Sequence, residues 1–281
     1  MSLNFEVIGV ESTPAERTWT EAETLLYALA VGAGQEDPLA ELEFTTENSA
    51  GVEQKVLPTF ANMIGGGGGQ LSLGDFDFAA VVHAEQAFTV HRPLPATGTA
   101  RSTSRITGMY DKGSAAQVVI EATACDAVTG EELATIRNSI FIRGEGGFGG
   151  DRGPRRDWEM PARPADERVT YRTGVNQALI YRLTGDRNPL HSDPKFAARG
   201  GFTQPILHGM CTYGYTGRAL LHTVCGSDPA RFLSMEGRFT RPVLPGDELA
   251  IEVWADAGTA YFRTTSGGAP VIDYGRMTFR A

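Results

Sequence analysis

Residues 205–222 have the sequence PILHGMCTYGYTGRALLH, in which apolar residues recur at roughly helical spacing. The proline near its start suits the first turn of a helix. Four short stretches rich in β-forming residues follow, and Pro-Gly-Asp, Ala-Gly and Gly-Gly turns separate them. One helix followed by an antiparallel meander predicts an α+β architecture, in which a curved sheet wraps a helix. The predicted strands are residues 231–240, 248–255, 260–265 and 270–280.

The first half of the chain repeats this organisation. A helical segment comes first, and four β-rich stretches follow it. Three segments of the first half also resemble segments of the second half, in the same order and at offsets of about 150 residues. Because 281 residues are close to twice the length of a typical domain, we predict a duplicated fold. The predicted strands are 81–91, 99–107, 115–126 and 132–143, and the matching segments are 25–29 with 179–183, 58–63 with 205–210, and 91–98 with 240–247.

Residues 144–168, GEGGFGGDRGPRRDWEMPARPADER, are dense in Gly, Pro and charge, which indicates a linker. We therefore predict an N-terminal repeat at residues 1–143 and a C-terminal repeat at residues 169–281. Two curved sheets lying side by side are expected to pair their edges, because pairing leaves few strand edges open to solvent.

Charge and composition disfavour several classes of partner. The net charge of −9 disfavours binding to nucleic acid or to an anionic membrane, and no apolar run approaches the length of a membrane span. The first residues, MSLNFEVIGVEST, lack the basic and apolar regions of a signal peptide, and the final MTFRA carries no organelle address. Three cysteines without CxxC spacing fit a reducing compartment. We expect a cytoplasmic protein.

Three patterns that can suggest a cofactor do not fit one here. Residues 144–149 match G-x-G-x-x-G, but the following DRGPRRD does not form the helix that a dinucleotide site needs. The run Gly65–Gly69 lacks the Lys-Ser/Thr of a phosphate loop, so we interpret it as a close-packed or flexible turn. The histidines show no metal-ligand spacing. We therefore expect neither a metal nor a cofactor.

Residues 181–193, YRLTGDRNPLHSD, carry the densest set of reactive groups. Pro189 disfavours helical backbone at the residue before it, so Asp186, Asn188 and His191 are expected on a rigid irregular loop. A carboxylate, an amide and an imidazole there can orient one water molecule and supply acid–base chemistry near neutral pH. Spacing alone leaves an alternative open, in which local hydrogen bonds stabilise a turn and His191 is a structural surface residue.

A short helix is predicted directly after this loop. Ser192 or Asp193 would cap its start, Pro194 would occupy its first turn, and Gly200 would end it. This helix would fix the C-terminal end of the loop.

The segment YRLTGDRNPLHSDPKFA, residues 181–197, resembles the hydratase 2 motif of the MaoC-like dehydratases, the family that includes the (R)-specific enoyl-CoA hydratases. The resemblance extends to residues 25–34, 205–210 and 239–247. At residues 83–86 the sequence is HAEQ, where the family usually has HGEQ. The resemblance implies a double hot-dog fold of two tandem repeats, each with a central helix wrapped by a curved antiparallel sheet.

The same resemblance implies an enzyme of the hydro-lyase class. It would add water reversibly to trans-2-enoyl-CoA and give (3R)-hydroxyacyl-CoA, in β-oxidation or in other fatty acid or sterol side-chain metabolism. Coenzyme A would belong to the substrate, and the family implies a homodimer. Three alternatives stay open: a 3-hydroxyacyl thioester dehydratase acting on acyl carrier protein, a hot-dog thioesterase, and a non-catalytic acyl-CoA-binding subunit.

By this resemblance, Asp186, Asn188 and His191 would position and activate the water. The backbone N–H of Gly209 would donate a hydrogen bond to the thioester oxygen. For His208, a structural role is the main alternative to substrate binding. Arg238 and Arg241 are further candidates for binding the CoA phosphates. The residues expected to bind substrate are His83, Gln86, Tyr181, Gly185, Arg199 and His208.

The first repeat is predicted to be catalytically empty. The residues that correspond to the reactive loop are 31–38, VGAGQEDP, which contain no histidine and no matching asparagine. This repeat would instead accommodate the acyl chain, with the glycine run near its central helix leaving space for it.

Overall fold

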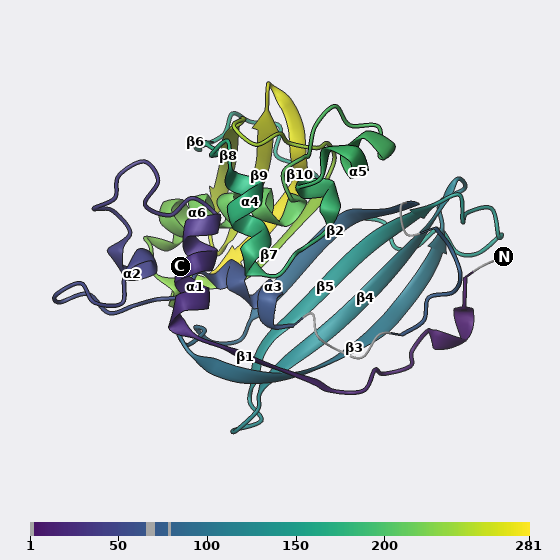
Figure 1. Ribbon diagram of the computed structural model, residues 1–281, viewed down its shortest axis with the longest axis horizontal. Helices are drawn as coiled ribbons and strands as arrows, with labels where there is room; N and C mark the ends of the chain where they lie inside the picture. Colours follow the sequence, from purple (N-terminus) through teal and green to yellow (C-terminus); the bar gives the residue numbers. More distant parts are fainter. Residues whose placement is uncertain (1–2, 66–70, 78–79) are drawn as a thin grey trace.

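One antiparallel sheet of ten strands runs through the residues that the computed structural model describes, 3–65, 71–77 and 80–281 (Figure 1). The strand order is β1-β3-β4-β5-β2-β7-β10-β9-β8-β6, so the first half of the chain supplies one half of the sheet. Strands β2 and β7 pair at the centre and join the two repeats, as the edge-pairing prediction requires. The strands are β1 (Ala15–Trp19), β2 (Val81–Val90), β3 (Gly98–Asp111), β4 (Ala115–Asp126), β5 (Glu132–Arg143), β6 (Glu167–Arg172), β7 (Phe232–Phe239), β8 (Glu248–Asp256), β9 (Thr259–Ser266) and β10 (Ala269–Phe279).

The eight strands predicted from the sequence are confirmed, and two strands were missed. Strands β1 and β6 are the two edges of the sheet, and their sequences AERTW and ERVTYR are short and polar. An edge strand exposes more of its surface than a central one, so it carries less apolar signal. Glu167 and Arg168, the last two residues of the predicted linker, already belong to β6. The domain boundaries otherwise stay a prediction.

Helix α6 (Gly209–Cys225) is the central helix of the second repeat and is buried along most of its length. It begins four residues after the predicted start at Pro205. Two glycines let neighbouring segments approach it closely: a Cβ at Gly214 would lie 2.3 Å from Val31, and one at Gly217 would lie 2.3 Å from Thr59. The shorter helices are α1 (Glu21–Ala30), α2 (Leu42–Thr45), α3 (Ala61–Ile64), α4 (Gln177–Tyr181) and α5 (Pro194–Arg199). Within the described ranges, no helix combines the length and apolar character needed to cross a membrane.

In the part of the chain that the structure describes, the helix that follows residues 58–60 of the first repeat is one turn long, shorter than the sequence predicts. Helix α3 ends at Ile64 and Gly65 follows it. Each glycine disfavours a helix by about 1 kcal/mol, so a glycine run opposes continuation of α3. Residues 66–69 of this run lie outside the described residues. Three apolar side chains of residues 71–77 pack in a second apolar cluster with strands β3–β5, namely Leu71, Leu73 and Phe76.

The first part of the predicted linker is fixed to the β3–β4 hairpin. The buried Asp111 carboxylate accepts backbone N–H bonds from Gly113 at 2.7 Å, Gly147 at 2.9 Å and Gly149 at 2.7 Å. Gly147 and Gly149 both have φ near +80°, a conformation that favours glycine. These N–H bonds hold the pKa of Asp111 below its usual value. The glycines at this position therefore anchor the chain and do not act as a flexible spacer.

A buried ionic cluster attaches the loop after α1 to helix α6. Arg218 is only 2% exposed. Its guanidinium lies 2.8 Å from a carboxylate oxygen of Glu36 and 2.9 Å from Glu41, and it donates to the carbonyl of Val31 at 3.0 Å. His222 contacts the same Glu41 carboxylate at 2.7 Å. The loop of the first repeat is thus held by charge to the helix of the second.

We expect Arg218→Gln to lower the free energy of unfolding by about 3 kcal/mol, the lower end of the range for removing one partner of a buried ion pair. Glutamine cannot neutralise the two carboxylates that remain. Urea titration followed by circular dichroism measures the change. The control is Arg101→Gln, because Arg101 pairs with Glu16 at 2.8 Å while both side chains are more than half exposed; its change should stay below about 1 kcal/mol. Equal changes in the two variants would contradict the buried role of Arg218.

Candidate active site

The loop between α4 and α5 has the irregular backbone that its proline and glycine predict. Gly185 has φ +136°, and residues Pro189–His191 form a single 3₁₀ turn. The predicted helix follows as α5, where the Asp193 carboxylate accepts the N–H of Lys195 at 2.8 Å. Both ends of the loop are therefore fixed by regular structure.

Local hydrogen bonds fold the loop back on itself. The Asp186 carboxylate accepts the N–H of Asn188 at 3.1 Å, and the Asn188 side-chain oxygen accepts the N–H of Leu190 at 3.0 Å. These turns of the Asx type are the structural alternative that spacing left open. They also bring the functional groups together, because ligand atoms of Asp186, His191 and His208 all lie within 4.8 Å of one another. The NH₂ group of Asn188 is the part of that side chain left to contact a ligand.

His191 is held in one tautomer by the backbone. Its Nδ1 lies 2.9 Å from the carbonyl oxygen of Ile206, and a carbonyl can only accept a hydrogen bond, so Nδ1 carries the proton. The other nitrogen, Nε2, therefore has a free lone pair. Burial lowers the pKa of His191, and the nearby Asp186 charge only partly opposes this effect. At neutral pH, Nε2 is an uncharged base beside a carboxylate.

His208 lies directly against His191. The two imidazoles stack with centroids 3.8 Å apart and planes inclined by 29°. His208 Nε2 donates to the backbone carbonyl of Asp186 at 3.3 Å. Burial lowers the pKa of His208 to about 4, so this ring is also neutral at pH 7. The sequence placed His208 among substrate-binding or structural residues, and the structure places it behind both reactive side chains.

The first residue of helix α6 is Gly209, which is exposed. The carbonyl of His208 accepts N–H bonds from Cys211 at 3.0 Å and Thr212 at 3.2 Å. The N–H groups of Gly209 and Met210 lie before Cys211, at the N-terminus of α6, where backbone N–H groups have no intrahelical acceptor. A Cβ at Gly209 would lie only 3.3 Å from the Phe239 ring. Glycine thus permits both close packing and access to the backbone N–H.

The first repeat contributes His83 and Gln86 from strand β2. The His83 ring lies 4.7 Å from the Phe239 ring, centroid to centroid. Burial lowers the pKa of His83 to about 4, and the Asp186 charge is close enough to oppose the shift. Gln86 is buried and donates to the Asn62 side chain at 2.8 Å. The candidate site therefore lies where the two repeats meet.

Of the remaining residues predicted to bind substrate, Gly185 directly precedes Asp186, while Tyr181 and Arg199 end the helices on either side of the reactive loop. Tyr181 is fully buried, and its ring lies 4.9 Å from that of His208, behind the loop. Arg199 is exposed on α5, with its guanidinium 4.8 Å from the centre of the Phe196 ring. Nothing in the structure tests a substrate contact for either residue.

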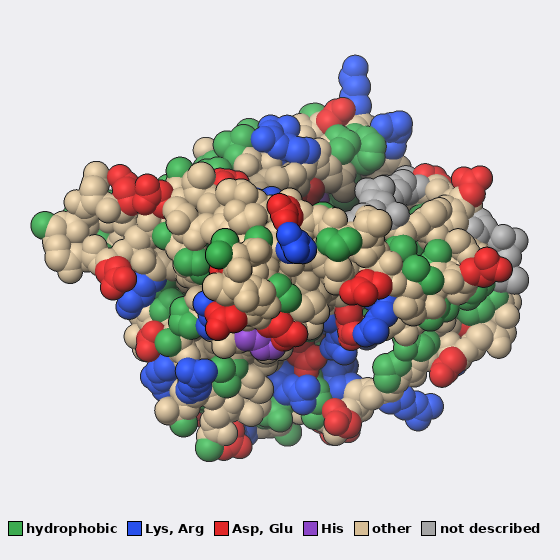
Figure 2. All heavy atoms as spheres, turned by 90° about the horizontal axis from the view of Figure 1, so that it is seen from below, with side chains coloured by type: hydrophobic (Ala, Val, Ile, Leu, Met, Phe, Trp, Pro, Cys, Tyr) green, Lys and Arg blue, Asp and Glu red, His purple; other side chains and the backbone are tan. Residues whose placement is uncertain are grey.

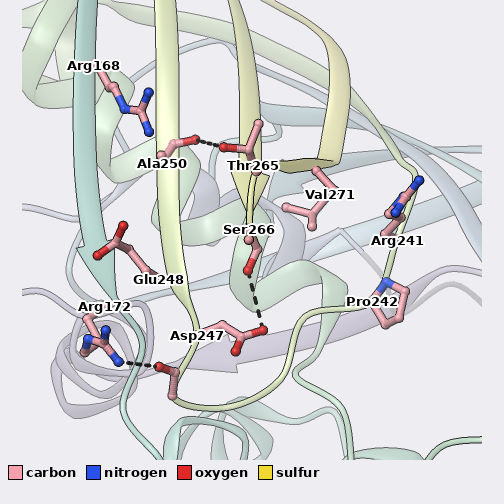
Figure 3. A pocket seen from close by; sticks show the side chains of 14 residues that line it. Arg168, Arg172, Arg241, Pro242, Asp247, Glu248, Ala250, Thr265, Ser266 and Val271 are labelled. Carbon is pink, nitrogen blue, oxygen red and sulfur yellow. Dashed lines mark hydrogen bonds between the residues drawn. The ribbon is translucent and has the colours of Figure 1, made fainter.

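Arg241 lies in a separate depression of about 710 Å³ on the second half of the sheet (Figure 3). Arg168 and Arg172 lie on the opposite side of this depression from Arg241, and Arg172 donates to the carbonyl of Gly246 at 3.1 Å. No residue that lines the depression belongs to the reactive loop. On the face drawn in Figure 2, Lys and Arg side chains lie interspersed with Asp and Glu.

A group of cations beside β2 was only partly predicted. Lys112 lies in the β3–β4 hairpin, close to Arg152 and Arg238. Burial lowers the pKa of Lys112, and the charges of Arg152 and Arg238 lower it further, while the charge of Glu85 opposes the shift. Lys112 also donates to the backbone carbonyl of Arg152. Arg238 pairs in register with Glu85, two residues from His83. Three distant segments supply these cations, so no sequence motif marks the group.

The donor set closest to a metal-ligand arrangement in the described residues is Asp186, His191 and His208. Each histidine already uses one nitrogen to bond a backbone carbonyl. The two remaining nitrogens lie in rings that stack with their planes inclined by 29°. The predicted absence of a metal stays a prediction.

Family comparisons divide the chain into two parts. Residues 18–144 match the model described as MFE-2 hydratase 2 N-terminal domain. Residues 158–273 match the model described as MaoC like domain.

Whole-chain comparisons agree with these matches. The chain is 44% identical to 3-hydroxyacyl-thioester dehydratase Y of Mycobacterium tuberculosis, over all of both chains. It is 40% identical to enoyl-CoA hydratase ChsH3 of the same organism, over 91% of each chain. The crystal structure of a MaoC-like dehydratase from Phytophthora capsici matches with a TM-score of 0.87 at 29% identity, over 99% of each chain.

Proposed function

Because the chain belongs to the MaoC-like dehydratase family, which has the double hot-dog fold, we propose that it is an (R)-specific 2-enoyl-CoA hydratase. It would add water reversibly to trans-2-enoyl-CoA and form (3R)-hydroxyacyl-CoA. The observation that carries this proposal is the unprotonated Nε2 of His191 beside the Asp186 carboxylate, next to the helix N-terminus at Gly209.

The reactive pair is suited to hold and deprotonate one water molecule. Asp186 and His191 Nε2 both accept hydrogen bonds, so a water between them would donate to each and direct a lone pair outward. The NH₂ group of Asn188 would add a third contact. Attack of the water oxygen on C3 forms the new C–O bond, while the base takes the released proton. The same base can return that proton to C2 on the same face, which gives net syn addition of one water.

The thioester carbonyl needs stabilisation during this step. As the water adds to C3, electron density moves from the double bond toward the carbonyl oxygen. The N–H of Gly209 would donate to this oxygen, and the positive end of the α6 dipole favours the charge that develops. The exposed position of Gly209 leaves this donor accessible.

The phosphates of coenzyme A require positive charge on a chain whose net charge is −9. We propose that Lys112, Arg152 and Arg238 supply it. This group lies beside the His83 end of β2, so it adjoins the site from the first-repeat side. The short helix α3 supports the prediction that the first repeat accommodates the acyl chain, because it covers less of the sheet than α6 covers in the second repeat.

The purified full chain tests this function directly. With crotonyl-CoA it should consume the enoyl absorbance, and chiral analysis should identify the (3R)-hydroxy product. Enoyl-CoA substrates of short, long and branched acyl chains should then be compared with the corresponding acyl carrier protein thioesters. Turnover of carrier-protein thioesters alone would make the chain a dehydratase of that class. A lack of turnover with every thioester would favour a binding subunit.

Two further features rest on composition and on family resemblance. We propose that the protein is cytoplasmic, which its free cysteines support, and that it forms a homodimer. Sedimentation of the purified chain measures the second feature.

A further inference from the structure

Two neighbouring buried polar atoms behind the reactive loop have no hydrogen-bond partner among the described residues. They are Nδ1 of His208 and the hydroxyl of Tyr181. Both residues are at most 1% exposed. Folded proteins satisfy nearly all buried polar groups with protein atoms or ordered water. Two uncompensated polar atoms on neighbouring rings therefore point to a further group that both atoms bind.

These atoms form one connected region. The Tyr181 ring lies 4.9 Å from the His208 ring and 6.3 Å from the Tyr27 ring, centroid to centroid. Burial raises the pKa of Tyr27, and its side-chain hydrogen bond with Thr59 opposes this rise. The residues come from α4, α1, the N-cap of α6 and the turn before α3, so both repeats contribute to the region.

The tautomer of His208 determines whether its unpaired Nδ1 atom is a hydrogen-bond donor or an acceptor. Its Nε2 donates to the carbonyl of Asp186 and therefore carries the proton. Its Nδ1 is then a buried lone pair that needs a donor. The Tyr181 hydroxyl is a donor on a neighbouring ring, but the two atoms do not bond directly. A water molecule placed between them would donate to Nδ1 and accept from the hydroxyl.

We propose that ordered water bridges His208 Nδ1 and the Tyr181 hydroxyl, and that these two residues are positioning residues for the hydration reaction. The bridge keeps the proton of His208 on Nε2. The protonated Nε2 donates to the Asp186 carbonyl, and this bond orients the imidazole so that its face stacks on His191. The kinetic part of this inference rests on the proposed function. The groups that face His208 are His191, Asp186, Tyr181 and Arg182.

Two structural measurements test the bridge without using activity. A crystal structure at high resolution should show an ordered water within hydrogen-bond distance of both His208 Nδ1 and the Tyr181 hydroxyl. In the full chain labelled with ¹⁵N-histidine, the ring nitrogen shifts should show His208 protonated at Nε2 and His191 at Nδ1. The Tyr181→Phe variant should lose the water and show a mixture of His208 tautomers. A dry contact, or an unchanged His208 tautomer in Tyr181→Phe, would overturn the bridge.

Kinetics test the positioning role. We expect Tyr181→Phe to lower kcat about tenfold, the rate equivalent of one hydrogen bond, with KM changed less than about twofold because the Tyr181 ring is fully buried against His208. The matched control is Tyr171→Phe, which removes a phenol hydroxyl from edge strand β6, where the ring lies under Arg218; its kcat and histidine spectra should equal those of the wild type. Equal kcat in the two variants would overturn the positioning role. If the wild type hydrates no thioester, the proposed function fails, while the crystal and the spectra still decide the bridge.

Discussion

Asp186→Asn should lower kcat for crotonyl-CoA hydration by about 10²–10⁴-fold, the range of general acid–base contributions. Asparagine has nearly the same shape, and its side-chain oxygen can still accept the N–H of Asn188, a bond of 3.1 Å in the wild type. The loop should therefore keep its fold. The amide has lost the negative charge, and its NH₂ group would donate a hydrogen bond where the carboxylate accepted one from the water. Steady-state kinetics with product analysis measures the loss.

Asp193→Asn is the matched control for this variant. Asp193 lies seven residues later and caps helix α5 by accepting the N–H groups of Lys195 and Phe196. Asparagine is an equally good cap, so this variant should keep wild-type kcat and stability. Near-wild-type turnover in Asp186→Asn, with a thermal unfolding midpoint equal to that of the control, would remove Asp186 from the chemistry.

His191→Ala should also lower kcat by about 10²–10⁴-fold, because it removes the free Nε2 lone pair. This variant additionally leaves the buried carbonyl of Ile206 without its donor and His208 without its stacking partner. Some loss of stability is therefore expected. His191→Gln separates the two effects, since its NH₂ group can donate to Ile206 while the amide cannot act as a base.

The control for the histidine variants is His91→Ala. His91 lies just after β2, where it contacts the Thr135 hydroxyl at 2.9 Å, and it should not affect kcat. The wild-type pH profile gives an independent check. Burial lowers the pKa of His191, so kcat/KM should fall on the acidic side only below the ordinary histidine value near 6.5, as Nε2 becomes protonated. An acidic limb centred above that value, or full activity in stably folded His191→Gln, would argue against His191 as the base.

Much of the sheet follows from local sequence. The eight central strands alternate apolar and polar residues between turn residues, which is enough to locate them within a few positions. The edge strands β1 and β6 lack this signal. The short helix α3 shows a second limit of prediction from sequence. Residues 58–63 resemble residues 205–210, which predicts helices of equal length in the two repeats, and only the glycines after residue 64 argue against a long helix in the first.

The reactive loop could be predicted because its geometry is local. Pro189 and Asn188 set its backbone, and the Asx hydrogen bonds span only two residues each. The contacts of His208 with His191 and of His83 with the Asp186 region depend on tertiary packing, since they join segments separated by 17 and 103 residues in the sequence numbering. The cations around Lys112 gather for the same reason. No spacing rule reaches that far along a chain.

The hydrogen-bonded pair β2–β7 also bears on how such a chain can evolve. Two separate single-repeat chains would have to associate at that seam, and both copies would carry every mutation. After gene duplication and fusion, the tether keeps the halves together at a high effective concentration, and each copy can change alone. In this chain, residues 31–38 contain no histidine and no asparagine, whereas residues 186–191 contain both. The loop of the first repeat has a structural role instead, because Glu36 and Glu41 hold it to helix α6 of the second repeat.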